Sequence, residues 1–352
     1  MSVTTIRSNL RDYTVHFQDN DNFVEGFSRF PHRLFVIDES VWRLHGHGCL
    51  STIPESELLI FPISEERKNL DSVMEVYDRL MERSAKKNMT LISIGGGIIQ
   101  DITGFVASTL YRGLNWVFVP TTLLAQADSC IGSKTSLNYK RFKNIIGTFY
   151  PPSEVHIYSP FLQTLQKSDF LSGMGEVAKL HIMGGSKTIT DLTDSLAAIL
   201  NKDKVELLSA IRRSLAVKLS YMEGDEFDTG RRNLLNYGHC FGHALETVCS
   251  YAIPHGQAVV IGMLVANRIA VQRGLLSEEN EQRMAEQLLI TLLDFKLDLS
   301  KYSITELISA MKQDKKRIGE GLVMVMVTDS LEMIKADDIS PEEVENALSK
   351  FI

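Results

Sequence analysis

The chain has 352 residues, of which 44% are hydrophobic and 23% are charged, so it is long enough to bury one large or two medium cores. Its formal net charge of −7 leaves no generally basic surface, and nucleic acid is therefore not an expected partner. No run of sequence approaches the roughly 18 apolar residues of a membrane helix, so no membrane partner is expected either.

Short apolar strands alternate with helical patterns in the first half of the chain. Helical patterns at 69–87 and 100–113 separate some of these strands, and this alternation predicts an α/β domain with a parallel sheet. The predicted strands cover residues 33–37, 58–61, 90–94, 115–119 and 154–158.

Strand patterns nearly vanish after Pro160. Helical periodicity runs through 161–300, and a late strand is expected at 321–327. We therefore predict an α/β domain over 1–160 and a mostly helical domain over 161–352, with the active site in the cleft between them.

Cysteine usage and the N-terminal segment indicate a cytoplasmic protein. The segment 1–17 lacks the apolar core of a signal peptide. No cysteines form a CxxC pair, and a chain of this size needs no disulfides, so reduced thiols are expected. The cysteines are Cys49, Cys130, Cys240 and Cys249.

A strand, three glycines and a helix follow one another in residues 91–105. Glycines Gly95 to Gly97 would let the backbone approach a phosphate at the helix N-terminus, although an ordinary tight turn explains the segment equally well. Asp38 follows the first strand, where a carboxylate can bind ribose hydroxyls or cap the next helix.

Residues 120–152 combine threonines, lysines and amides in a short segment with glycine and serine, which suits a phosphorylated ligand. Arg112 ends the preceding helical pattern, where the helix dipole alone would favour a cation. Glu176 and Lys179 are three residues apart on a predicted helix. A surface ion pair is the ordinary interpretation, but their small and apolar neighbours favour a buried pair.

A polar stripe on one predicted helix, over 231–246, carries Arg232, Asn236, His239 and His243. His239 and His243 have the i,i+4 spacing of a helical metal pair, and His255 opens the next apolar helix. Together with a carboxylate they would form an open three-ligand zinc site. Spacing alone leaves open whether His243 or His255 is the partner of His239. The histidines of HGHGC (45–49) are interpreted as part of a flexible loop.

Seven segments, in order, resemble the motifs of the 3-dehydroquinate synthases and, more broadly, of the sugar-phosphate cyclases. The resemblance covers residues from about 35 to 330. The segments are GGGIIQDITGFVASTLYRG, VPTTLLAQADSCIGSKTSLN, KNIIGTFYPP, SGMGEVAKLHI, DEFDTGRRNLLNYGHCFGHALE, IPHGQAVVIGM and MKQDKK.

This resemblance implies a Rossmann-like parallel-sheet NAD domain and a C-terminal, mostly α-helical metal-binding domain. It implies Zn²⁺ or Co²⁺ held by Glu176, His239 and His255, with His243 facing the substrate phosphate or relaying protons. The implied NAD contacts are Asp38, Glu65, Lys68, Gly95, Gly96, Gly97, Asp101, Thr121, Thr122, Lys143 and Thr164. The implied catalytic residues are Asp128, Lys134, Lys179, Lys218, Arg232, Asn236 and His243. Substrate binding is expected from Arg112, Asn144 and Lys315.

The implied reaction is that of a carbon–oxygen lyase of the shikimate pathway to aromatic amino acids. It converts 3-deoxy-D-arabino-heptulosonate 7-phosphate to 3-dehydroquinate and phosphate by transient oxidation with NAD, β-elimination of phosphate, reduction and intramolecular aldol closure. Arg112 reaches the neighbouring subunit's site in this family, which implies a homodimer.

Three positions depart from the family pattern, namely Gln100, Ser133 and Asp228. Ser133 and Asp228 lie near substrate segments, so a related cyclase acting on sedoheptulose 7-phosphate or glucose 6-phosphate remains an alternative. Lys218 and Arg232 are expected to hold a substrate carboxylate, which favours the dehydroquinate reaction. A metal-dependent polyol dehydrogenase is a further alternative, but the phosphate-type cluster of Lys134, Lys143 and Asn144 argues against it.

Overall fold

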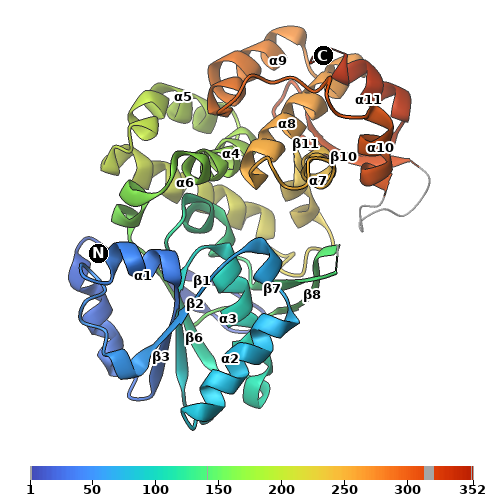
Figure 1. The fold of residues 1–352 in the computed structure, drawn as a ribbon. Helices are drawn as coiled ribbons and strands as arrows, with labels where there is room; N and C mark the ends of the chain where they lie inside the picture. The colour runs from blue at the N-terminus through green and yellow to red at the C-terminus, as the bar shows by residue number, and fades with distance from the viewer. Residues whose placement is uncertain (1, 141, 313–320, 350, 352) are drawn as a thin grey trace. The chain divides into compact units, whose positions relative to one another are not determined.

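The computed structural model describes residues 2–140, 142–312, 321–349 and 351. The chain divides into two compact units, 1–165 and 166–352, a few residues after the boundary expected from the sequence. Figure 1 shows the first unit in blue to green and the second in green to red. No helix of the described residues has the length and apolar content needed to cross a bilayer.

The first unit is built on a seven-stranded sheet with the order β1-β2-β9-β6-β5-β3-β4. All neighbouring strands pair in parallel except β1 and β2, which are antiparallel. The strands are β1 (Ser2–Ile6), β2 (Tyr13–Phe17), β3 (Arg33–Asp38), β4 (Leu58–Phe61), β5 (Thr90–Gly95), β6 (Asn115–Pro120) and β9 (Glu154–Ile157). This sheet confirms the predicted α/β class and contains every strand expected in this half.

Central strands of the sheet are apolar on both faces, as strands of a parallel sheet covered by helices should be. Ile92, Ile94, Val117 and Val119 are completely buried. Helix α3 packs against β5 and β6 and α1 against β3, and α2 packs against α3. The helices are α1 (Glu39–His45), α2 (Leu70–Glu82) and α3 (Gly97–Thr109), with short turns η1 (Asp21–Arg29), η2 (Glu55–Glu57), η3 (Glu65–Arg67), η4 (Leu110–Arg112), η5 (Ala125–Ser129) and η6 (Ser159–Thr164).

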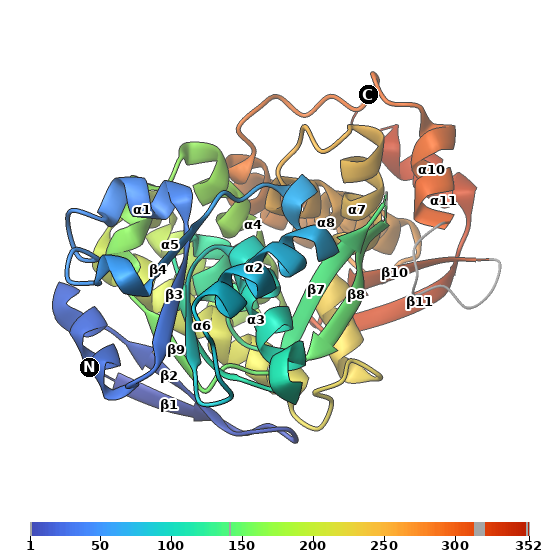
Figure 2. The ribbon, with the colours of Figure 1, turned by 60° about the horizontal axis from the view of Figure 1, so that its bottom comes forward.

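A separate antiparallel hairpin, β7 (Lys134–Tyr139) and β8 (Phe142–Phe149), follows η5 (Figure 2). It lies in the segment interpreted from the sequence as a phosphate-binding stretch, and no strands were predicted there. Its strands are rich in polar residues, and β8 is exposed along most of its length, so the usual apolar alternation of a strand is weak.

The second unit, over its described residues, is mostly helical and includes one two-stranded sheet. Its elements are α4 (Lys167–Met183), α5 (Ser186–Leu200), α6 (Lys204–Met222), η7 (Arg231–Asn236), α7 (His239–Val248), α8 (His255–Gln272), α9 (Glu278–Met284), η8 (Ala285–Leu289), η9 (Ile290–Leu292), α10 (Ile304–Lys312), β10 (Leu322–Val327), β11 (Met333–Ile339) and α11 (Pro341–Leu348). β10 is the late strand expected from the sequence.

The prediction of one helix through 231–246 is wrong. A short 3₁₀ turn ends at Asn236 and α7 begins at His239, because Gly238 takes a left-handed conformation with φ of 77°. Only His239 and His243 therefore share a helix. A side chain at Gly238 would also meet the Val259 carbonyl at 2.5 Å, so α8 passes too close for any other residue.

Glycine contacts set the spacing of α4 against α8, the two most buried helices of this unit. A Cβ atom at Gly256 would lie 1.7 Å from the Ser172 carbonyl, and one at Gly175 would lie 2.1 Å from the Gly256 carbonyl. Backbone atoms cannot yield as a flexible side chain can, so the helices approach this closely only with glycine at both positions. The crossing places Glu176 on α4 beside His255 on α8.

We expect Gly256→Ala to lower the free energy of unfolding by about 1–3 kcal/mol, because the added methyl group forces α4 and α8 apart. Urea unfolding followed by circular dichroism measures the effect. Gly48→Ala is the control, since its Cβ would meet only the His45 carbonyl at an ordinary 3.6 Å. Equal stability of the two variants would contradict the tight crossing.

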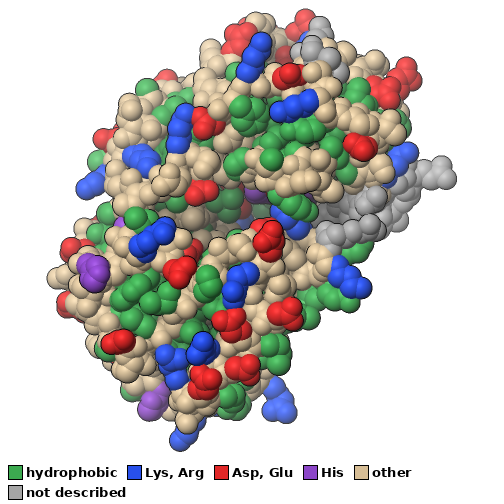
Figure 3. Space-filling model, in the orientation of Figure 1, with side chains coloured by type: hydrophobic (Ala, Val, Ile, Leu, Met, Phe, Trp, Pro, Cys, Tyr) green, Lys and Arg blue, Asp and Glu red, His purple; other side chains and the backbone are tan. Residues whose placement is uncertain are grey.

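Charged side chains of both signs mix over the face of the molecule shown in Figure 3. This mixture agrees with the modest net charge of −7. Any anion site must therefore be built locally by particular residues.

Candidate active site

Three of the segments proposed for NAD meet at the carboxyl edge of the first unit's sheet, where open α/β sheets bind nucleotides. The amide of Thr121 donates to the Gly95 carbonyl at 2.9 Å, joining the ends of β5 and β6. A Cβ on Gly96 would lie 3.0 Å from the Thr122 methyl group, so the glycine turn packs directly on that threonine. Helix α3 starts there without a side-chain cap, which leaves its first amides to an anion.

Asp38 ends the neighbouring strand β3 at the same edge. Its Oδ1 accepts a hydrogen bond from the Ser40 amide at 2.8 Å, so it caps helix α1. Burial raises the pKa of this carboxyl group above its usual value. The capping role weighed at the sequence level is thus present, and it does not prevent the second oxygen from contacting a ribose.

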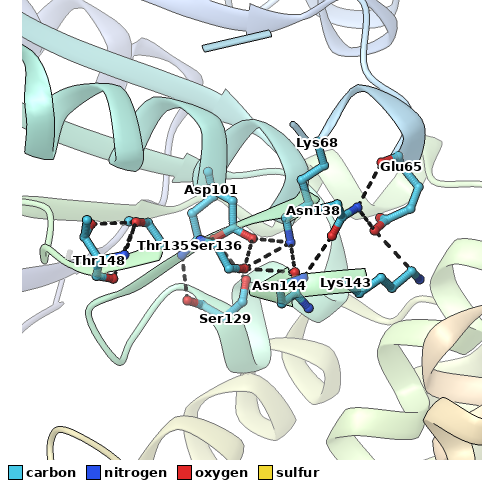
Figure 4. A network of polar contacts seen from close by, with 11 residues as sticks. Glu65, Lys68, Asp101, Ser129, Thr135, Ser136, Asn138, Lys143, Asn144 and Thr148 are labelled. Atoms are coloured by element: carbon cyan, nitrogen blue, oxygen red, sulfur yellow. Dashed lines mark hydrogen bonds and ion pairs between the residues drawn. The ribbon is translucent and has the colours of Figure 1, made fainter. Parts of the chain in front are cut away.

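Lys68 lies at the centre of a polar network (Figure 4). Its Nζ is 2.5 Å from Asp101 Oδ2 and donates to Asn144 Oδ1 at 2.7 Å and Ser136 Oγ at 3.2 Å. Asp101 also accepts hydrogen bonds from the Ser136 amide and hydroxyl, at 2.9 and 3.0 Å. Burial raises the pKa of Asp101, and the ion pair with Lys68 opposes that shift. Residues expected to bind cofactor and substrate are therefore joined in one cluster.

Glu65 and Lys143 extend this network along the hairpin. Asn138 donates to Glu65 Oε1 at 2.8 Å, and Lys143 Nζ lies 3.7 Å from the same oxygen. The Asn144 amide donates to Asn138 Oδ1 at 3.0 Å, and Asn144 has a positive φ of 53°. Glu65 and Lys68, both proposed NAD contacts, are thus tied to β7 and β8.

Gln100, one of the departures from the family pattern, has a structural role. Its Nε2 donates to the Ser129 carbonyl and its Oε1 accepts from the Ser129 hydroxyl, both at 2.7 Å. This double contact fastens η5 to α3. Because η5 contains Asp128, the glutamine stabilises the turn that presents that candidate residue.

We expect Lys68→Met to lower the free energy of unfolding by roughly 2 kcal/mol or more, because it leaves the buried Asp101 carboxylate without its cation. Thermal unfolding of Lys68→Met, of Asp101→Asn and of the double variant gives a double-mutant cycle that measures the interaction between the two side chains. The double variant should recover part of the loss. Strict additivity of the two single effects would show that Lys68 and Asp101 do not interact.

The proposed metal ligands of the second unit come together from three helices. Glu176 Oε1 lies 3.4 Å from His239 Nε2 and 3.3 Å from His255 Nε2. The Glu176 side chain is 1% exposed, and neither of its oxygens has a hydrogen-bond partner among the described residues. Glu176 Oε2 is 2.5 Å from Lys179 Nζ. The carboxylate is therefore paired with a cation, although the geometry is not that of a hydrogen bond.

These residues fit a divalent cation of the zinc type. Bonds of about 2.1 Å place the ligand atoms of a tetrahedral ion about 3.4 Å apart, which matches the separation of Glu176 Oε1 from each of the two histidine nitrogens. The His243 ring also belongs to this group, because ligand atoms of His239, His243 and His255 lie within 4.8 Å of one another. His243 is exposed, whereas His239 and His255 are partly buried.

Hydrogen bonds orient the imidazoles of His239 and His255. His239 Nδ1 is 3.1 Å from the Tyr237 carbonyl, and His255 Nδ1 is 3.1 Å from Glu246 Oε2, which leaves each Nε2 facing Glu176. Burial and the nearby Lys179 hold the pKa of His239 well below its usual value, so the ring is neutral. Burial lowers the pKa of His255, but Glu176 and Glu246 together raise it to about 10 in the metal-free chain. An ion bound there has to displace that proton.

Three of the remaining proposed residues of the second unit are buried cations, and Lys179 among them lies beside Glu176. Lys179 and Lys218 are buried on α4 and α6, and Arg232 is buried on η7, which packs against α6. The Arg232 guanidinium donates to the Glu226 carbonyl, and its amide donates to Asp225 Oδ2 at 2.8 Å. Asn236 donates to the Asn233 carbonyl at 2.7 Å.

Other proposed residues lie on the first unit or outside the described part. Lys134 begins β7 and is exposed, and Thr164 in η6 is hydrogen-bonded to His45 at 2.9 Å. Arg112 is exposed in η4, where it and Tyr111 have positive φ values of 62° and 52°. Lys315 lies outside the described residues.

Glu246 has a functional position that the sequence reasoning missed. It is buried, and it holds His255 through the 3.1 Å contact. The available signal was its place seven residues after His239, because that spacing puts both side chains on one face of α7. The contact glycines Gly175 and Gly256 were missed as well, and nothing in a single sequence marks them.

Several solved structures share the fold of this chain. It matches 2-epi-5-epi-valiolone synthase from Streptomyces hygroscopicus subsp. jinggangensis 5008, solved with NAD⁺ and Zn²⁺ bound, with a TM-score of 0.86 and 24% identity over 100% of this chain and 99% of that one. A 2-deoxy-scyllo-inosose synthase solved with carbaglucose-6-phosphate, NAD⁺ and Co²⁺ gives a TM-score of 0.84 at 21% identity, covering 100% of both chains. An iron-containing alcohol dehydrogenase from Thermotoga maritima reaches 0.66 at 16% identity, over 96% of both chains. The fold is that of the sugar-phosphate cyclases.

Sequence relatives narrow the class to one family. Residues 58–172 match the N-terminal domain of 3-dehydroquinate synthase, and residues 173–317 match its C-terminal domain. The 3-dehydroquinate synthase of Geotalea uraniireducens is 40% identical over 75% of this chain and 73% of its own length. That of Clostridium tetani is 36% identical over 97% of this chain and 92% of its own length. The chain belongs to the 3-dehydroquinate synthase family, which confirms the resemblance noted in its motifs.

Proposed function

We propose that this protein is a 3-dehydroquinate synthase, a lyase that converts 3-deoxy-D-arabino-heptulosonate 7-phosphate to 3-dehydroquinate and phosphate. The observation that carries the proposal is the convergence of Glu176, His239 and His255 in a chain 32–40% identical to proteins of that name. The reaction depends on NAD, which residues at the sheet edge would bind, and on a divalent metal ion, which Glu176, His239 and His255 would bind.

Glu176, His239 and His255 would hold the divalent cation, with Zn²⁺ or Co²⁺ suited to two imidazoles and a carboxylate. When bound, the ion polarises substrate oxygens and stabilises negative charge that develops on them. Glu246 orients His255, and Lys179 keeps the Glu176 carboxylate ionised: although burial raises the pKa of Glu176, Lys179 and the two histidines hold it well below its usual value.

The glycine turn, Asp38, Lys68, Asp101 and the Thr121–Thr122 pair would hold NAD⁺ at the sheet edge, together with Glu65, Lys143 and Thr164. NAD⁺ supplies a hydride acceptor that later returns the hydride, so it is unchanged over a turnover. The amides at the start of α3 favour the pyrophosphate charge. Lys68 fixes Asp101 and Asn144 before any ligand arrives, which lowers the entropy cost of binding.

Substrate anions would be bound by the buried and exposed cations of the proposed set. Lys218 and Arg232 suit the substrate carboxylate, because a buried guanidinium presents a fixed pair of donors. Lys134, Asn144, Asn236 and His243 suit the phosphate and ring hydroxyls, with Asp128 as an acceptor. The leaving phosphate would itself accept the proton removed during β-elimination, so these residues would chiefly align the substrate. Arg112 and Lys315 complete the proposed set.

Three further features belong to the same proposal. We place the enzyme in the cytoplasm, in the pathway to aromatic amino acids, and as a homodimer to whose neighbouring site Arg112 contributes. The exposed, left-handed position of Arg112 at the end of a buried helix supports a role outside its own unit's core. Analytical ultracentrifugation measures the oligomeric state.

The substrate is tested with a panel of sugar phosphates and a phosphate-release assay. The heptulosonate 7-phosphate should release phosphate, while sedoheptulose 7-phosphate and glucose 6-phosphate should not, and NADH should not accumulate. Phosphate release from one of the latter two alone would favour a related cyclase. That alternative is motivated by Ser133 and Asp228, which both have positive φ values, of 64° and 60°. Accumulation of NADH with a polyol would indicate a dehydrogenase.

A further inference from the structure

A second cluster of metal-ligating side chains lies on the sheet of the first unit. Strands β2 and β9 run in parallel with His16 paired to His156 and Thr14 paired to Glu154. Paired residues of neighbouring strands lie on the same face, and so do residues two apart on one strand. The register therefore brings His16, Glu154 and His156 together on one face.

The ligand atoms of these three residues lie within 4.8 Å of one another. Glu154 Oε2 is 2.8 Å from His156 Nε2 and 4.0 Å from His16 Nε2. The two imidazoles are stacked, with ring centroids 4.6 Å apart and an interplanar angle of 4°. A tetrahedral ion needs its ligand atoms about 3.4 Å apart. Binding would therefore separate Glu154 from His156 and turn the His16 ring away from Thr14 Oγ1, to which its Nε2 is hydrogen-bonded at 2.8 Å.

The surroundings support a built site with one open side. The side chain of His156 is 5% exposed, while those of His16 and Glu154 are 20% and 19% exposed. The Phe27 ring packs edge-on against His156 at 4.9 Å. Burial lowers the pKa of both imidazoles, so they are neutral near neutrality, which is the form that binds metal.

Polar partners are present on the far side of His156 as well. Its Nδ1 lies 2.7 Å from the amide Nε2 of Gln18, a residue that is 7% exposed and whose Oε1 has no hydrogen-bond partner among the described residues. Rotating the amide by half a turn presents Oε1 to an Nδ1–H group, which is the second contact that metal-bound histidines require. The same amide therefore serves the metal-free and the metal-bound tautomer.

We propose that His16, Glu154 and His156 form a second divalent-cation site of the zinc type, independent of the ion at Glu176. Water would complete the tetrahedron from the open side. Arg29 contacts Glu154 and competes with the ion for that carboxylate. Arg29 also donates to the Gly26 carbonyl at 2.7 Å and lies over the Phe30 ring. It therefore keeps these two contacts when the ion displaces it from Glu154. Bound metal would fasten β2, and with it the β1–β2 hairpin, to β9.

The test is the zinc content of the full-length protein after dialysis against low free Zn²⁺, measured by plasma mass spectrometry. The wild-type chain should bind two equivalents, and His16→Ala and Glu154→Gln should each bind one. His47→Ala, which removes an exposed histidine, should still bind two. Arg29→Gln should bind the second equivalent several-fold more tightly, because a competing cation is gone.

A second readout keeps the test informative if a variant is poorly folded. Zn²⁺ added to the one-equivalent protein should raise the melting temperature of the wild type and of His239→Ala, but not that of His16→Ala, whose half-buried ring can be lost without unfolding. One equivalent in the wild type, or two in His16→Ala, would overturn the proposal. Loss of catalysis in His239→Ala bears only on the other ion.

Discussion

His239→Ala should abolish turnover and remove one equivalent of divalent metal while the fold persists. The His239 ring, at the first residue of α7, places its Nε2 3.4 Å from the Glu176 carboxylate, whose side chain is 1% exposed. Without it, negative charge developing on the substrate loses its strongest stabiliser, and we expect kcat to fall by roughly 10³-fold or more. Metal analysis and phosphate release on the same preparation measure both effects.

His32→Ala is the matched control, because it removes an exposed imidazole from the first unit. Its metal content and rate should equal those of the wild type. Circular dichroism should give His239→Ala the helix content of the parent. A His239→Ala protein that turns over at the normal rate would show that the ion, if bound, does no chemistry.

Arg232→Lys should lower kcat/KM for the heptulosonate 7-phosphate by ~10²–10³-fold, as expected when one partner of a buried, charge-assisted contact is lost. Arg232 is 4% exposed, and its own backbone and guanidinium are fixed by Asp225 and Glu226. Lysine keeps the charge but cannot form the paired hydrogen bonds that a carboxylate accepts from guanidinium. Steady-state kinetics, with KM carrying much of the change, measures the loss.

Arg231→Lys is the companion variant, because Arg231 is exposed and donates to the Ser220 carbonyl at 3.1 Å. It should retain near-normal kinetics. If Arg232→Lys were equally harmless, the substrate would lack a carboxylate at this position. That outcome would favour the sugar phosphates that lack a carboxylate over the heptulosonate.

Strands β3 to β6 and β9 could be predicted from the sequence because each is a short, mostly apolar and mostly buried run of residues. Ile92 and Val117 lie on central strands covered on both faces, so their pattern is continuous rather than alternating. β1, β2, β7, β8 and β11 gave a weaker signal. β8 is mostly exposed and β11 mixes charged with apolar residues. These segments are strands because they pair with β7 and β10, and their composition alone does not indicate it.

The proposed metal site was also predicted only in part. The spacing of His239 and His243 indicated a site, but the choice between His243 and His255 depends on how α7 and α8 cross. That crossing is set by contacts such as a Cβ on Gly262 lying only 1.9 Å from the Gly238 carbonyl. The periodicity of residues within one helix carries no information on how closely two helices pack. For the same reason the break at Gly238 was missed, since a helical pattern continues through it.

The metal dependence of the proposed reaction is measured by phosphate release from 3-deoxy-D-arabino-heptulosonate 7-phosphate with metal-free protein. With NAD⁺ present, chelated protein should be inactive, and added Zn²⁺ or Co²⁺ should restore release of phosphate together with formation of 3-dehydroquinate. Unchanged release after complete removal of metal, or none from the fully loaded enzyme, would contradict the account.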